Sequence, residues 1–211
     1  MRYRQRPDPD RPARLVVLVS GVGSNLEALL DACAEPRYGA TVVAVGADRA
    51  GIRGLDIAAK ADVPTFVDAV AGYASRDAWD AALCEHVAAY RPDLVVSAGF
   101  RKLAGATFLD RFGGRYVNTH NSLLPAFPGI HAPREALEYG VKITGATLFF
   151  VDAGVDTGPI VAQVAVPVNP GDTEQTLDER IKDAERRQLV HYVGLLAREG
   201  WTIEERLVTI P

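Results

Sequence analysis

The stretch RLVVLVSGVGSNLEALL, residues 14–30, brings together three structural signals that decide the fold class. Its first part, 14–20, is a nearly continuous apolar run, which predicts a strand buried on both faces. A glycine-containing turn follows, and the spacing of apolar residues over 24–33 then predicts a helix. A buried strand that leads through a tight turn into a helix is the opening unit of a parallel α/β sheet.

The same alternation continues through the first half of the chain. Further strands are predicted at 41–48, 64–68, 93–99 and 115–119, with helices near 52–61 and 75–90. Parallel strands joined by helices need cover on both faces. The sequence therefore predicts an α/β fold with a Rossmann-like, mostly parallel sheet flanked by helices on both faces.

The C-terminal part has a different pattern. The segments 144–154 and 159–168 predict two strands close enough in sequence to form an antiparallel hairpin, which would make the sheet mixed. A short helix is expected after Pro133, a long one over about 173–199, and an edge strand near the C-terminus. Residues 1–12 are charged and rich in proline, so we expect a disordered tail there and a single domain over 13–211.

The composition excludes several classes of function. Of the 211 residues, 48% are hydrophobic and 24% charged, as in an ordinary globular protein. A formal net charge of −4 argues against a nucleic-acid partner. The absence of a signal peptide and of a membrane-spanning run predicts a cytoplasmic protein without a membrane partner. Cys33 and Cys84 fall in predicted helices and are expected to be ordinary thiols.

Three polar segments follow predicted strand ends. They are SGVGSN (20–25), SAGFRKL (97–103) and NTHNS (118–122). Ligands of open α/β sheets bind beyond the carboxyl ends of the strands. The coincidence of the three segments therefore predicts one site for small-molecule substrates.

The first of these segments predicts an anion site. Gly23 permits close backbone approach, Ser24 and Asn25 offer capping side chains, and amides at a helix N-terminus bind anions. A monophosphate fits this loop. A dinucleotide is a second interpretation, because Asp48 could serve as a ribose-binding acid, although Leu26 stands where the dinucleotide fingerprint has glycine or alanine. A purely structural turn is the third.

The third segment predicts a catalytic centre. Asn118 and His120 are two residues apart on an ending strand and share one face. Asp156 lies in the glycine-flanked loop VDAGVDTGP (151–159). Together they would supply an amide donor for an oxyanion, an acid–base group and a carboxylate that orients the imidazole. No serine nucleophile elbow and no metal-ligand spacing accompanies them, and His131 could contact substrate or begin a helix.

The segments NTHNSLLPAFPGIHAPREAL (118–137) and GATLFFVDAGVDTGPIVAQ (145–163) resemble the formyltransferases that use 10-formyltetrahydrofolate. VSGVGSNLEALL (19–30) resembles the subfamily that formylates phosphoribosylglycinamide in de novo purine biosynthesis. The resemblance covers nearly the whole chain. It implies a transferase in which the substrate amine attacks the formyl group directly, through a tetrahedral intermediate.

The resemblance also implies roles for individual residues. Asn118, His120 and Asp156 would be catalytic, with His120 kept protonated by Asp156. Gly23, Ser24 and Asn25 would hold the phosphate of the ribotide, and Lys182 and Glu185 would face its glycinamide. The folate co-substrate would be contacted by Arg76, Arg101, Lys102, Leu103, Ala104 and Asn118.

Two departures from the family pattern stand out. Asn121 follows His120 where proline is usual, which should loosen the turn, and FRKLA (100–104) replaces a more apolar segment, which should alter folate affinity. The nearest alternative is hydrolysis of formyltetrahydrofolate, but such enzymes usually carry an additional N-terminal domain. A methionyl-tRNA formyltransferase would need a basic C-terminal domain. A non-catalytic nucleotide-binding module is a further alternative, and monomer and homodimer both remain open.

Overall fold

The computed structural model describes residues 2–211, and it contains a mixed seven-stranded sheet in the order β4-β3-β2-β5-β6-β7-β8. The strands are β2 (Ala13–Val19), β3 (Ala40–Ala47), β4 (Thr65–Val67), β5 (Leu94–Ser97), β6 (Tyr116–His120), β7 (Ile143–Phe150) and β8 (Ile160–Pro167). Pairing is parallel from β4 through β6. It is antiparallel from β6 to β7 and from β7 to β8. The predicted α/β fold with a C-terminal hairpin is confirmed.

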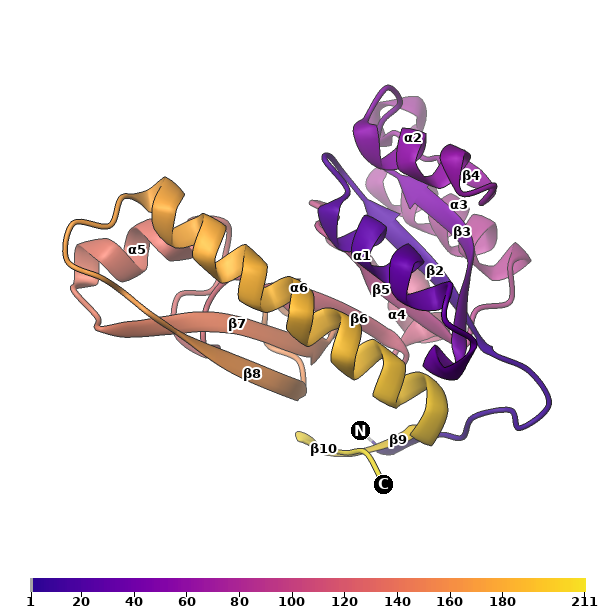
Figure 1. The fold of residues 1–211 in the computed structure, drawn as a ribbon. Helices are drawn as coiled ribbons and strands as arrows, with labels where there is room; N and C mark the ends of the chain where they lie inside the picture. Colours follow the sequence, from indigo (N-terminus) through magenta and orange to yellow (C-terminus); the bar gives the residue numbers. More distant parts are fainter. Residues whose placement is uncertain (1) are drawn as a thin grey trace.

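Helices cover both faces of the parallel part (Figure 1). The helices are α1 (Ser24–Cys33), α2 (Arg53–Lys60), α3 (Arg76–Ala89), α4 (Ala106–Phe112), α5 (Ala132–Tyr139) and α6 (Glu174–Glu199). Of these, α5 lies away from the parallel part, beside α6 at the hairpin end. Alternate residues of β2 divide between two clusters: Val17 packs with residues of α1, α2 and α6, whereas Val16 packs with residues of α3 and α4. Full burial of each such side chain contributes about 1.5–3 kcal/mol. This two-sided burial explains why β2 is a continuous apolar run.

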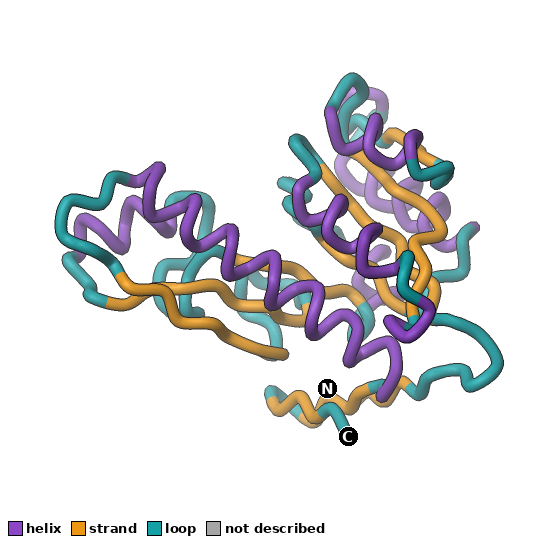
Figure 2. Tube along the Cα trace, viewed as in Figure 1, coloured by secondary structure: helices purple, strands orange, loops and turns teal. Residues whose placement is uncertain are grey.

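Helix α6 connects the two parts of the sheet. It begins with a capping box at Thr173, where the N-terminus was expected. Its first half packs on the β7–β8 hairpin through Leu177 and Ile181, and its second half packs on the parallel part through Leu189 and Val193. Figures 1 and 2 show the helix running along both parts. Within residues 2–211, no helix is both long and apolar enough to cross a membrane.

The chain ends depart from the predictions. Residues 2–5 form strand β1 (Arg2–Gln5), which pairs with β9 (Trp201–Glu204); β9 also pairs with β10 (Leu207–Thr209), in a separate three-stranded sheet. The expectation of a disordered tail is therefore wrong for residues 2–5, and at Met1 it lies outside the described residues. A strand is present near the C-terminus, as predicted, but the segment forms the hairpin β9–β10 in the small sheet and not an edge of the central sheet.

Aromatic packing explains why the two chain ends are structured and form this small sheet. The ring of Tyr3 stacks on Trp201 at a centroid distance of 6.2 Å, and Trp201 stacks on Phe150 at 5.6 Å. The Trp201 indole also donates a hydrogen bond of 2.8 Å to the Gly114 carbonyl. The pairing of β1 with the C-terminal segment cannot be inferred from the composition of residues 1–12. The charged, proline-rich composition alone therefore predicted disorder.

Candidate active site

The end of β6 brings Asn118 and His120 to the border between the parallel and antiparallel parts of the sheet. On one side, Asn118 is paired with Ser97, the last residue of β5. On the other side, His120 is paired with Thr147 of β7. His120 is 6% exposed and Asn118 is half-buried. Both residues therefore lie at the carboxyl end of β5, where the sequence predicted the site.

The His120 imidazole lies between two hydrogen-bond acceptors. Its Nε2 is 2.8 Å from the Phe127 carbonyl oxygen, and its Nδ1 is 3.5 Å from Oδ2 of Asp156. A carbonyl oxygen only accepts, so Nε2 must carry a proton. The Asp156 carboxylate opposite Nδ1 is close enough to orient the ring. The structure thus brings Asp156 beside His120.

The position of Asp156 is itself unusual. Its φ of 55° places a residue other than glycine in the left-handed region, which costs energy. The backbone N–H of Gly129 donates a hydrogen bond of 2.8 Å to Asp156 Oδ2, the same oxygen that faces His120. The side chain is only 12% exposed. The loop therefore holds a nearly buried carboxylate against the imidazole.

A polar network fixes the segment that follows His120. The Thr147 hydroxyl donates to the Ser122 carbonyl at 2.7 Å and accepts from the Leu124 N–H at 3.0 Å. The Gln163 amide donates to the Leu124 carbonyl at 2.8 Å and to the Thr147 hydroxyl at 3.0 Å. These bonds hold the chain that leads from Asn121 to the Phe127 carbonyl.

Thr147 and Gln163 were not among the site residues predicted from the sequence. They are direct partners on β7 and β8 and lie on one face of the hairpin. The available signal was a polar residue within the apolar strand GATLFF (145–150), where Thr147 is fully buried. A buried polar residue needs a hydrogen-bond partner, so its presence in a core strand indicates a constrained neighbour.

The glycine loop forms the N-terminus of α1, with Gly23 as the cap residue at φ 79° and no side-chain cap. The expected capping by Ser24 and Asn25 is therefore wrong. The Asn25 amide instead donates a buried hydrogen bond of 2.7 Å to Glu185 of α6. With no side chain bound to them, the first-turn amides of α1 suit an anion, as the monophosphate interpretation requires.

Glu185 is the buried carboxyl group on this side of the site, at 8% exposure. Burial raises its pKa, although the Asn25 amide and the Thr119 hydroxyl act in the opposite direction. Lys182, almost one turn earlier on α6, pairs with Asp178. The structure thus brings Glu185 to the glycine loop, and Lys182 lies on the same helix.

The residues assigned to folate surround the ends of β2 and β5. The Arg76 guanidinium lies 4.2 Å from the Trp79 ring centroid and donates to the Leu103 carbonyl. The Arg101 N–H donates to the Ser20 hydroxyl at 2.9 Å. Leu103 is 61% exposed, and Ala104 packs partly buried against the cluster of α3 and α4. Ser97 is paired with Asn118, so the segment SAGFRKL (97–103) begins beside the end of β6.

Asp48 does not fit the dinucleotide interpretation. Its side chain is fully buried, with Oδ2 2.9 Å from Arg49 and 3.6 Å from the Lys102 ammonium. A carboxylate held in this way is not free to bind ribose hydroxyls. The pairing also draws Lys102 toward β3, so the positive charge of the FRKLA segment is partly neutralised.

The thiols and carboxylates offer no metal centre in the part of the chain that the structure describes. Cys33 and Cys84 are both free. Burial raises the pKa of Cys33 to about 11 and also raises that of Cys84, so both thiols are protonated at neutral pH. Between residues 2 and 211, no group of three or more histidine, cysteine, aspartate or glutamate residues could hold a metal ion.

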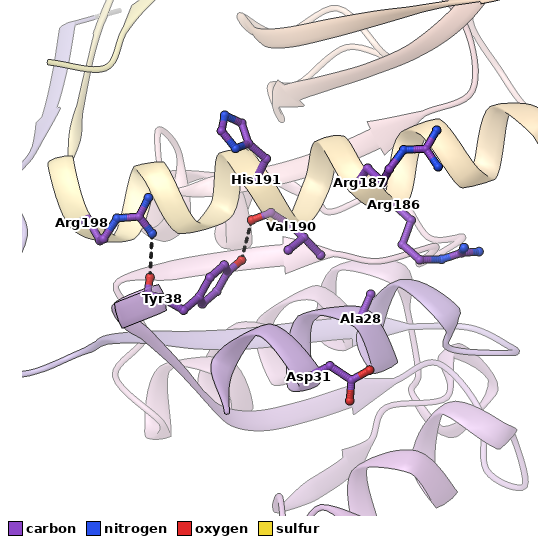
Figure 3. Close-up of a pocket in the computed structure, with 8 residues that line it drawn as sticks. All are labelled: Ala28, Asp31, Tyr38, Arg186, Arg187, Val190, His191 and Arg198. Carbon is purple, nitrogen blue, oxygen red and sulfur yellow. Dashed lines mark hydrogen bonds between the residues drawn. The ribbon is translucent and has the colours of Figure 1, made fainter. Parts of the chain in front are cut away.

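A separate groove of about 580 Å³ runs between α1 and α6 (Figure 3). Its lining includes three arginines of α6, together with Asp31 of α1. The Tyr38 hydroxyl donates to the Val190 carbonyl at 2.7 Å, and Arg198 donates to the Tyr38 carbonyl at 3.1 Å. None of the predicted site residues lines this groove, so it is distinct from the centre around His120.

Comparison with known proteins shows which family the chain is similar to. The family described as formyl transferase matches residues 13–193. A phosphoribosylglycinamide formyltransferase from Mycobacterium tuberculosis is 58% identical over 205 residues, which is 97% of this chain and 94% of that protein. The crystal structure of glycinamide ribonucleotide transformylase 1 from Symbiobacterium toebii has a TM-score of 0.91 and 47% identity, covering 94% of both chains. A phosphoribosylglycinamide formyltransferase from Coxiella burnetii has a TM-score of 0.89 and 30% identity, covering 95% of this chain and 94% of that one. The chain belongs to the formyl transferase family.

Proposed function

We propose that the chain transfers the formyl group of 10-formyltetrahydrofolate to the amine of 5-phosphoribosylglycinamide, in de novo purine biosynthesis. The observation that carries this proposal is the imidazole of His120, held between the Phe127 carbonyl and Asp156 at the end of β6. Residues 13–211 would act as one formyltransferase domain. The enzyme would work in the cytoplasm on small molecules, without a nucleic-acid or membrane partner.

Two groups of residues would bind the two substrates. Gly23, Ser24 and Asn25 would hold the ribotide phosphate at the N-terminus of α1, and Lys182 and Glu185 would face the glycinamide. The folate would lie along Arg76, Arg101, Lys102, Leu103 and Ala104, and would reach Asn118. The hydrogen bond between Asn25 and Glu185 supports this arrangement, because it places the phosphate loop beside the carboxyl group assigned to the amine.

The chemistry is a direct acyl transfer. The amine nitrogen attacks the formyl carbon, and the carbonyl electrons move to oxygen to give a tetrahedral oxyanion. The Asn118 amide and Nδ1–H of His120 would donate hydrogen bonds to this oxyanion. Nε2–H is engaged by Phe127. Nδ1 lies 3.5 Å from Asp156, which is too far for a close hydrogen bond, so its N–H would turn to the oxyanion. Collapse of the intermediate breaks the bond to N10 of the folate. The proton lost by the amine is relayed through water to N10, and Asp156 stabilises the imidazolium throughout.

One assay separates this function from its alternatives. The protein is incubated with 10-formyltetrahydrofolate, with and without the ribotide, and tetrahydrofolate release is measured. Release that requires the ribotide is expected. Release that is equally fast without it would identify a hydrolase, and no release under either condition would favour a non-catalytic nucleotide-binding module.

Replacing Gly23 with alanine should raise the KM for the ribotide by about tenfold or more, because the phosphate relies on close backbone approach. It should also destabilise the fold. A left-handed residue other than glycine costs about 1–2 kcal/mol, and the new Cβ would lie 2.7 Å from the Gly54 Cα. Gly51→Ala is the matched control, since Gly51 has a φ of 69° but no atom within 4 Å of its Cβ position. Equal ribotide KM values in the two variants would contradict a phosphate site at this loop.

Replacing Glu185 with glutamine should raise the melting temperature at pH 7 and weaken ribotide binding. Because the folded-state pKa of Glu185 is raised, folding is favoured most below the unfolded value of 4.5, and this contribution is lost as the pH rises through the folded value. Glutamine removes the charge that is costly at neutral pH. The gain in melting temperature over the native chain should therefore shrink toward pH 4.

The control for this experiment is Glu179→Gln, an exposed position on the same helix. It should leave both the melting temperature and the ribotide KM near their native values. A melting temperature of Glu185→Gln that stays below the native one at every pH would show that the carboxylate stabilises the fold, against this account.

A further inference from the structure

The end of β6 presents alternate side chains to two different parts of the protein. Asn118 and His120 share the face that carries the catalytic pair. Asn121, the next residue after the strand, contacts α6 instead: its amide donates a hydrogen bond of 3.2 Å to Oδ1 of Asp178. The Thr119 hydroxyl acts to lower the pKa of Glu185 on the same helix. The hydrogen bond of Asn121 thus ties the end of the catalytic strand to α6.

Lys182 lies between Asp178 and Glu185 on α6. Its ammonium group pairs with Oδ2 of Asp178 one turn earlier. The Asp178 carboxylate therefore uses one oxygen for Asn121 and the other for Lys182. Asp178 is 24% exposed, whereas Lys182 is 55% exposed. A half-exposed lysine samples many rotamers unless a partner holds it, and ordering such a side chain on binding lowers affinity.

The bond to Asp178 depends on the side-chain amide of Asn121, because a residue without a side-chain donor could not make it. We infer that Asn121 and Asp178 are positioning residues: they hold Lys182 in the place where it meets the ribotide and join α6 to the catalytic strand. This inference rests on the proposed function, because it takes Lys182 to face that substrate.

Steady-state kinetics with both substrates test the inference. Asp178→Asn keeps an acceptor for Asn121 but removes the charge that holds Lys182. It should raise the ribotide KM by about fivefold, with kcat and the folate KM changed by less than about twofold. Asn121→Ala leaves the ion pair but removes its anchor, so its ribotide KM should rise by about twofold. A purely structural role would not confine the change to one KM.

Asp183→Asn is the matched control for charge removal from α6. Asp183 pairs with Arg186 at 2.9 Å and is 63% exposed. This variant should keep native kinetics. A fivefold rise in its ribotide KM would show that net charge, rather than the Asp178 contact, controls binding, and it would overturn the inference.

Lys182→Ala separates failure of the inference from failure of the proposed function. If Lys182→Ala leaves the ribotide KM unchanged, the assignment of Lys182 to the ribotide is wrong. If Lys182→Ala raises the KM but Asp178→Asn does not, only the positioning role is overturned. The expected result is that both raise it, and that Asp178→Asn has no further effect in the Lys182→Ala background.

Discussion

Replacing Asp156 with asparagine should lower kcat/KM by about a hundred- to a thousandfold. The variant keeps the size of the side chain, and its amide oxygen can still accept the hydrogen bond from Gly129. It loses the negative charge 3.5 Å from Nδ1 of His120. The His120 ring then lacks the carboxylate that orients and polarises it, so it donates a weaker hydrogen bond to the oxyanion. Steady-state kinetics with both substrates measure this loss.

A double-mutant cycle with His120→Ala shows whether the two groups act as a unit. Because Asp156 works through the imidazole, the double variant should be scarcely slower than the poorer single variant. Asp152→Asn is the matched control: Asp152 bonds to Gly154 and Thr157 in the same loop. Its kcat/KM should stay near the native value. Additive losses in the double variant would mean that His120 and Asp156 act independently.

Asn118→Asp should lower kcat by about a hundred- to a thousandfold while leaving the ribotide KM nearly unchanged. The two side chains have almost the same shape, but the carboxylate has no N–H to donate and repels the developing oxyanion. The loss should therefore appear in the transition state and not in substrate binding. Asn118→Ala removes the donor without adding charge, so its kcat should fall less than that of Asn118→Asp.

Two results with these variants would contradict the role of Asn118 as a donor to the oxyanion. If the amide only binds the folate in its ground state, the folate KM should rise and kcat should stay near the native value in both variants. Equal kcat values in Asn118→Ala and Asn118→Asp would likewise argue against an oxyanion at this position, because a negative charge placed there would then have no effect.

The sequence predicted the parts of the fold that depend on local periodicity. The apolar run of β2 indicated burial on both faces, and the structure confirms it through Val16 and Val17, which pack into different clusters. The polar segments after β2, β5 and β6 indicated the edge of the sheet where the site would form. The proximity of Asp156 to His120 could be predicted because the strand end and the glycine-flanked loop can both be recognised in the sequence.

The features that could not be predicted depend on contacts between residues far apart in the sequence. The cross-strand contact of Thr147 with Gln163 requires the register of β7 on β8. The bond between Asn25 and Glu185 joins α1 to α6, which lie far apart in the chain. Asn25 was predicted to cap the helix because asparagine often does so near a helix N-terminus. The local sequence gives no indication that Glu185 lies beside it.

The most direct test of the proposed site is a crystal structure with the ribotide and a folate analogue that cannot transfer its formyl group. The account predicts that the phosphate lies on the backbone amides of residues 23–25 and that the substrate amine lies beside Glu185. It also predicts the folate N10 within reach of Asn118 and His120. A phosphate bound in the groove between α1 and α6, or an amine far from His120, would contradict the account.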